Sequence, residues 1–130
     1  MPKRIYIIDD DEDDIEFLQM AVREVDASCE CAGFSNSTEA LGLLTHTENG
    51  LPDYIFLDLN MPRLNGRSCL QQLKRHQRLS EIPVVIYSTS QRSSDREEML
   101  QMGAAYYFSK PVLYQDVLQI VETVFKRVVC

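Results

Sequence analysis

The sequence predicts an α/β domain in which helices cover both faces of a parallel β-sheet. Five short apolar runs alternate with segments of helical periodicity along the chain. This alternation is typical of βαβ units, whose right-handed crossovers keep the strands parallel. The run at residues 54–57 is apolar at every position, which indicates a strand buried on both faces.

The elements of the first half can be assigned in order. Residues 5–8 form the first strand, and a helix follows that has acids in its first turn, where the helix dipole favours them. Its apolar stripe recurs at three- and four-residue steps and consists of Ile15, Leu18, Ala21, Val22 and Val25. The second strand is predicted at 29–34, and the polar segment 35–39 supplies N-cap candidates for the second helix. The breaker segment 49–52 then precedes the strand at 54–57.

The second half repeats the pattern. The third helix follows Gly66, Pro83 opens the fourth strand, and a helix is predicted at 94–102. Gly103 is a natural C-cap before the fifth strand at 105–109, and a closing amphipathic helix ends the chain. The best match is a flavodoxin-like, doubly wound sheet of five parallel strands in the order 2-1-3-4-5 with five helices.

Composition limits the class of protein. A chain of 130 residues is one domain of ordinary size, so a single domain is expected over 1–130. No apolar stretch approaches the ~20 residues that span a bilayer, and residues 1–4 run straight into a strand. We therefore expect a cytoplasmic protein without a signal peptide or membrane contact. The net charge of −7 argues against direct nucleic-acid binding, which needs a basic face.

The cysteines and histidines do not form a metal-binding pattern. They are Cys29, Cys31, Cys69 and Cys130, with His46 and His76. The two cysteines of the second strand are two residues apart, so their thiols would share one face of the strand. They lack further ligands at the spacing of a zinc site. We expect reduced, structurally ordinary thiols and solvated histidines.

Acids, hydroxyls and one lysine follow the predicted strands. Asp58 ends the strand at 54–57, and the acidic run 9–11 ends the first strand. The fourth strand ends in the hydroxyl residues 88–90, and the fifth ends at Lys110. In open α/β sheets ligands bind outside the carboxyl ends of the strands, at the switch point between strands one and three. This edge is therefore predicted to bind a hard divalent cation and a phosphoryl group.

These motifs resemble the receiver domains of two-component response regulators, in the single-domain, chemotaxis-regulator-like form. The resemblance spans essentially the whole chain and rests on Asp9, Asp10, the segment 58–66, Ser88, Gly103, Ala104, Tyr107, Lys110 and Pro111. It implies a phosphoprotein of a phosphorelay that receives a phosphoryl group from a sensor histidine kinase or histidine phosphotransfer protein. Such a protein catalyses its own phosphorylation and dephosphorylation and is not an enzyme acting on other substrates.

The resemblance also implies a Mg²⁺ site. Asp10 and Asp58 would supply direct carboxylate ligands, the Asn60 backbone carbonyl a third, and Asp9 a contact through water. The residues alone leave the register along the acidic run open by one position, and Asp11 also fits a helix-capping role.

The remaining site residues follow from the same resemblance. Asp58 would form an aspartyl phosphate by in-line attack, with Lys110 paired to one phosphoryl oxygen. Ser88 would donate to another oxygen, and Thr89 would add a backbone amide. The bond between Lys110 and the following proline is of a type that can be cis, and in the family this geometry aims the lysine inward. Ser88 and Tyr107 are the implied switch, because the aromatic ring turns inward when the hydroxyl moves toward the phosphoryl group.

The output surface is predicted on the fourth helix, fifth strand and fifth helix, at 92–102, 105–109 and 113–125. This face could bind a downstream target protein or a second copy of the chain as a homodimer, and the sequence does not choose. A stand-alone regulator without an output domain is expected, similar to small regulators of which some are paired with phytochrome-type kinases. An excised N-terminal receiver of a longer regulator is the alternative.

Two other classes of protein share part of this pattern. A Mg²⁺-dependent phosphohydrolase of small phosphates also uses an aspartate nucleophile at a strand end, but it needs a second acid and a substrate-capping element, and no cap insert is visible. A pseudo-receiver, which would be a purely structural binding module, is disfavoured. The chain has all the phosphorylation-site residues that the resemblance implies, namely Asp9, Asp10, Asp58, Ser88 and Lys110.

Overall fold

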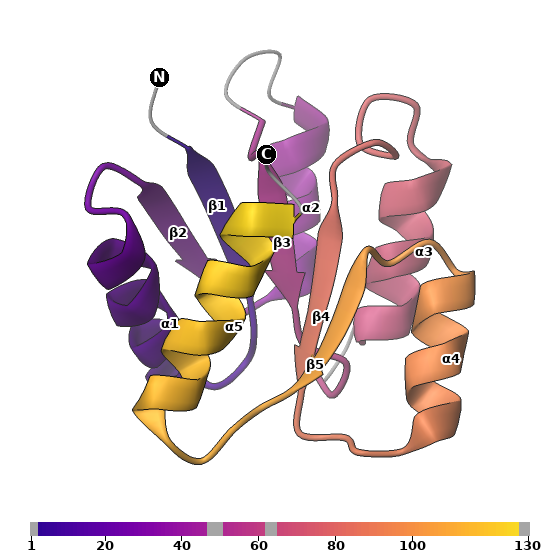
Figure 1. Cartoon of the computed structure of the whole chain (residues 1–130). Helices are drawn as coiled ribbons and strands as arrows, with labels where there is room; N and C mark the ends of the chain where they lie inside the picture. Colours follow the sequence, from indigo (N-terminus) through magenta and orange to yellow (C-terminus); the bar gives the residue numbers. More distant parts are fainter. Residues whose placement is uncertain (1–2, 47–50, 62–64, 128–130) are drawn as a thin grey trace.

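The computed structural model describes residues 3–46, 51–61 and 65–127. Its strands are β1 (Arg4–Ile8), β2 (Glu30–Phe34), β3 (Tyr54–Leu57), β4 (Val84–Ser88) and β5 (Tyr106–Ser109). Its helices are α1 (Glu12–Val25), α2 (Ser37–His46), α3 (Gly66–Arg75), α4 (Ser93–Gln101) and α5 (Tyr114–Arg127). The strands form one parallel sheet in the order β2-β1-β3-β4-β5 (Figure 1), so the predicted doubly wound fold is confirmed. The predicted boundaries of β1, β2 and β5 differ from these by one residue at the start, and those of α4 differ by one residue at both ends.

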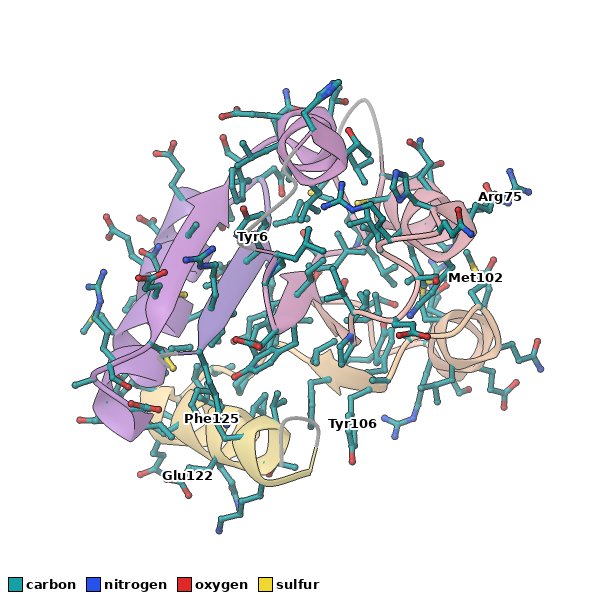
Figure 2. The ribbon with its side chains drawn as sticks, turned by 90° about the horizontal axis from the view of Figure 1, so that it is seen from above. Tyr6, Arg75, Met102, Tyr106, Glu122 and Phe125 are labelled. Carbon is teal, nitrogen blue, oxygen red and sulfur yellow. The ribbon has the colours of Figure 1, made fainter. Side chains whose placement is uncertain are left out.

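Two helix layers enclose the sheet. The buried side chains of α1 and α5 pack on one face, and those of α2, α3 and α4 pack on the other. Figure 2 shows these layers from above, with Phe125 of α5 on one side of the sheet and Arg75 of α3 on the other. Every residue of β3 and β4 is buried, as expected for central parallel strands with apolar side chains on both faces.

Local caps determine where the chain leaves the sheet and enters a helix. The Asp11 side chain accepts the first free amides of α1, and the Asn65 side chain accepts the Ser68 amide at the start of α3. Asn36 caps α2 in the same way. Gly103 has a φ of 106°, a left-handed conformation that glycine adopts without strain, and this ends α4 as the sequence predicts.

Among the described cysteines, Cys29 and Cys69 are buried and Cys31 is partly buried. Burial raises the pKa of Cys29 to about 11 and those of Cys31 and Cys69 to about 12, so these cysteines stay protonated and unreactive at neutral pH. Cys130 lies outside the described residues. Among the described residues, no helix has the length and apolar character required to cross a membrane.

Candidate functional site

The carboxyl ends of the strands meet at the lower edge of the sheet in Figure 1. Backbone hydrogen bonds continue one residue past the strands at this edge. The Asp58 amide donates to the Ile8 carbonyl at 2.9 Å, and the Lys110 amide donates to the Ser88 carbonyl at 2.7 Å. The sheet thereby holds the backbone of both predicted site residues in place.

Three carboxylates gather at this edge. Asp9 and Asp58 are buried while Asp10 is exposed, and one oxygen from each lies within 4.8 Å of the others. The group thus offers carboxylate oxygens from two buried acids and one exposed acid. Hard cations such as Mg²⁺ prefer this donor type, so the donor set fits the predicted ion.

Asp11 points elsewhere. Its carboxylate accepts the backbone amides of Asp13 and Asp14, at 3.0 and 3.3 Å, and so caps α1. Within the described residues it does not belong to the three-carboxylate group. The structure therefore gives Asp11 the capping role and brings the carboxylates of Asp9, Asp10 and Asp58 together.

Asp58 has one oxygen without a hydrogen-bond partner. Only 5% of the residue is exposed, and its Oδ1 atom is buried and unpaired. Burial raises the pKa of Asp58, against the lowering effects of the Lys110 charge, the Asn60 backbone amide and the Ser88 hydroxyl. A buried acceptor with no partner is expensive, so this atom is suited to receive a cation or a covalent group.

Asp9 lies deeper and is held on both sides. Its Oδ1 accepts the Asp11 amide at 2.9 Å, and its Oδ2 pairs with Lys110 Nζ at 2.7 Å. Burial raises the pKa of Asp9 to about 6 even though Lys110 lowers it. This carboxylate is already occupied by protein donors, which is consistent with the indirect metal contact predicted for it.

Lys110 points into the site and has three carboxylates around it. Its Nζ lies 2.7 Å from Asp9 Oδ2, 2.7 Å from Asp14 Oδ2 and 3.9 Å from Asp58 Oδ2. Burial alone would lower the pKa of Lys110, but the hydrogen bonds to Asp14 and Asp9 raise it overall, so the ammonium stays charged. The described chain contains no cis peptide bond, so the lysine reaches inward from a trans bond.

Asp14 is a site residue that the sequence reasoning missed. The sequence pattern places it in the acidic first turn of the first helix, where the helix dipole favours acids. Its contact with Lys110 joins residues 96 positions apart. No local pattern reports a contact of that sequence separation.

The predicted switch pair meets through Ser90. The Ser88 side chain is fully buried, and its Oγ accepts the Ser90 amide at 3.3 Å. The Tyr107 ring is 4% exposed, and its hydroxyl donates to the Ser90 carbonyl at 3.0 Å. Tyr107 therefore lies inward in this structure, while the Thr89 side chain is exposed.

A second polar network flanks the site. Arg67 of α3 forms ion pairs with Asp95 and Glu98 of α4, the latter at 2.7 Å. Asp95 also accepts the Ser90 hydroxyl at 2.5 Å. The network connects α3, α4 and the β4–α4 loop, and of its members the sequence reasoning singled out only Ser90.

Gly66 packs directly against the backbone of Asp58. Its amide donates to the Leu59 carbonyl at 3.0 Å, and a Cβ at this position would lie 2.3 Å from the Asp58 carbonyl oxygen. Only glycine permits this approach, which explains physically why a glycine follows Asp58 in the motif.

Fold and site together define a doubly wound α/β domain whose switch-point edge carries acids, a buried hydroxyl and a lysine. The family model of the response regulator receiver domain matches residues 5–122. The chain belongs to this family, which acts in two-component signal transduction and in which aspartyl phosphorylation and Mg²⁺ binding are general features.

Curated relatives are similar over part of their own length. Response regulator MprA of Mycobacterium sp. (strain KMS) is 31% identical over 127 residues, which cover 98% of this chain and 52% of that protein. The probable methanogenesis regulatory protein FilR2 of Methanothrix harundinacea (strain 6Ac) is 35% identical over 88 residues, covering 65% of this chain and 57% of that protein. This chain thus spans little more than half the length of either relative.

Solved structures agree over nearly the whole chain. The phosphorylated cyanobacterial phytochrome response regulator RcpA has a TM-score of 0.88 at 28% identity, with 97% of this chain and 93% of that chain covered. The bacteriophytochrome response regulator AtBRR has a TM-score of 0.81 at 26% identity, with coverage of 100% and 95%.

Proposed function

We propose that Asp58 accepts a phosphoryl group from a sensor histidine kinase or histidine phosphotransfer protein in a Mg²⁺-dependent reaction. The observation that carries this proposal is the unpaired, buried Oδ1 of Asp58 beside two further acids. Lys110 Nζ stands 3.9 Å from the other Asp58 oxygen. Nucleophile, cation ligands and a compensating positive charge thus share one edge.

The roles of the acids follow from their burial and partners. Asp10 is exposed and Asp58 has a free oxygen, so these two carboxylates, with the Asn60 backbone carbonyl, would hold Mg²⁺ directly. Asp9 would contact the ion through water, because both its oxygens already accept protein donors. When bound, Mg²⁺ neutralises charge between the carboxylates and the phosphoryl oxygens.

The chain's own residues would position the phosphoryl group. Asp58 provides the attacking oxygen, and phosphoryl transfer requires little more than alignment and charge neutralisation. Lys110 would pair with a phosphoryl oxygen, Ser88 would donate its hydroxyl, and the Thr89 amide would bind a further oxygen. The protein would in this way catalyse its own phosphorylation and dephosphorylation without turning over other substrates.

The signal would leave through α4, β5 and α5, the surface formed by residues 92–102, 105–109 and 113–125. Ser88 connects to this surface through Ser90. The Ser90 amide donates to Ser88 Oγ, and the Ser90 carbonyl accepts a hydrogen bond from the Tyr107 hydroxyl. A shift of Ser88 toward a phosphoryl group would alter both contacts. The partner would be a downstream protein or a second copy of the chain, and the charge of −7 disfavours nucleic acid.

The test is modification with acetyl phosphate, and binding of beryllofluoride, with and without Mg²⁺. Both should require Mg²⁺ and should be lost in Asp58→Asn but retained in Asp13→Asn, which removes an acid outside the site. Modification that survives Asp58→Asn would refute the assignment. Steady release of phosphate from a phosphomonoester would instead support the phosphohydrolase class.

The output surface is tested by amide-shift mapping. On adding beryllofluoride and Mg²⁺, shifts beyond the phosphoryl pocket should cluster on α4, β5 and α5. Shifts that cluster on α1 and α2 would contradict this part of the proposal.

A further inference from the structure

Lys110 is held by a carboxylate that lies outside the cation site. Asp14 Oδ2 and Asp9 Oδ2 are both 2.7 Å from Lys110 Nζ, whereas the nearer Asp58 oxygen is 3.9 Å away. Among the described residues, the carboxylates close enough to share a cation are those of Asp9, Asp10 and Asp58, and Asp14 is not one of them. The contact made by Asp14 is therefore with the lysine and not with the ion.

Asp14 is joined to the cap of α1 and lines a cavity beside Lys110. Its backbone amide donates to the capping Asp11 side chain at 3.3 Å, which holds the first turn of α1 against the sheet edge. Next to the ion pair is a cavity of about 180 Å³ with Asp14, Lys110, Phe17, Tyr87, Tyr114 and Val117 among its lining residues. Lys110 thus lines this cavity and also lies near Asp58, with its Nζ 3.9 Å from Asp58 Oδ2.

A lysine ammonium group has three N–H donors and no acceptor. Asp9 and Asp14 already take two of these donors at 2.7 Å, so a shift of Lys110 Nζ toward a phosphoryl group on Asp58 would compete with these two contacts. Asp9 belongs to the same carboxylate group as Asp58, so that contact can be kept during the shift. Asp14 lies on α1, and its contact opposes the shift.

We propose, on the basis of the proposed function, that Asp14 is a positioning residue that holds Lys110 on the α1 side in the unphosphorylated protein. It thereby opposes the pairing of Lys110 with the phosphoryl group. A ligand that needs the shifted lysine binds only those molecules in which Asp14 has released it. The apparent affinity is therefore the intrinsic affinity multiplied by the fraction of molecules in that state. Asp14 would in this way set how readily the domain is activated.

The experiment is a beryllofluoride titration at saturating Mg²⁺, followed by amide shifts, on the parent protein, Asp14→Asn and Asp13→Asn. Asp13→Asn is the matched control. It removes a negative charge from the same helical turn, but at an exposed residue. Asp14→Asn should bind beryllofluoride about fivefold more tightly than Asp13→Asn, the scale of a partly exposed ion pair. Asp14→Glu, which restores the charge, should return the affinity toward that of the parent.

A second readout reports on the lysine itself. In the protein without Mg²⁺, the ε-methylene resonance of Lys110 should move in Asp14→Asn and stay in place in Asp13→Asn. Asp14→Ser provides a second variant if the asparagine variant unfolds, since the cap of α1 uses only the backbone amide of this residue.

The outcomes separate the two proposals. If the parent binds beryllofluoride and Asp14→Asn binds no more tightly than Asp13→Asn, the inference about Asp14 is wrong and the proposed function stands. If the folded parent fails to bind beryllofluoride in the presence of Mg²⁺, the proposed function is wrong and the inference falls with it.

Discussion

Replacing Gly66 by alanine should destabilise the protein at the backbone of Asp58. An added Cβ would lie 2.3 Å from the Asp58 carbonyl oxygen and 2.6 Å from Leu59 Cα, whereas non-bonded carbon contacts are normally about 3.5–4.0 Å. Both neighbours are main-chain atoms, so no side-chain rotation can relieve the overlap. The main chain of Asp58 or the start of α3 must move by about an ångström.

The magnitude follows from two opposing effects. Overpacking typically costs about 1–3 kcal/mol, and contact with backbone places Gly66→Ala near the upper end. Alanine also has a higher helix propensity than glycine and makes the unfolded chain less flexible. These two effects together stabilise the folded protein by up to about 1 kcal/mol. We therefore expect a net loss of about 2 kcal/mol in the free energy of unfolding.

Urea unfolding provides the assay, with Gly42→Ala as the matched control. Gly42 lies inside α2, and a Cβ there would meet no atom within 4 Å, so this variant should gain about 0.5–1 kcal/mol. A Gly66→Ala protein as stable as Gly42→Ala would refute the steric argument. Mg²⁺ binding should weaken in Gly66→Ala and stay unchanged in Gly42→Ala, because only the former displaces Asp58.

Three further predictions concern the acids and the lysine. Asp10→Ala should weaken Mg²⁺ binding more than Asp11→Ala, which should instead lower stability by about 1 kcal/mol through loss of the helix cap; metal titration and urea unfolding of both variants check this. Lys110→Ala should keep or tighten Mg²⁺ binding but lose the amide shifts that beryllofluoride causes, and a spectrum identical to that of the activated parent would contradict it. Burial raises the pKa of Asp9 from 3.8 to about 6, so the folded state holds the proton more tightly. In the absence of divalent cations, stability should therefore fall as the pH rises from about 4 to about 6, by on the order of 2–3 kcal/mol, and this slope should be smaller in Asp9→Asn.

The sequence by itself was enough for the fold and for the location of the site. Short apolar runs alternating with helical stripes determine the order of strands and helices, because strand and helix periodicities are local properties of the chain. Asp58 and Lys110 follow directly after strands, and the carboxyl ends of parallel strands share one edge. Their convergence could therefore be predicted before any coordinates were known.

Only the tertiary structure decided how the acids divide their roles. Asp9, Asp11 and Asp14 are neighbouring acids whose partners the sequence does not show. Asp9 pairs with Lys110, Asp11 caps α1, and Asp14 pairs with the same lysine, which lies 96 residues away in sequence. Gly66 shows the same dependence on packing, since the approach to Asp58 that excludes a Cβ exists only in the folded chain. These roles depend on side-chain direction and on contacts between segments distant in sequence, and neither property is encoded in a local pattern of residue types.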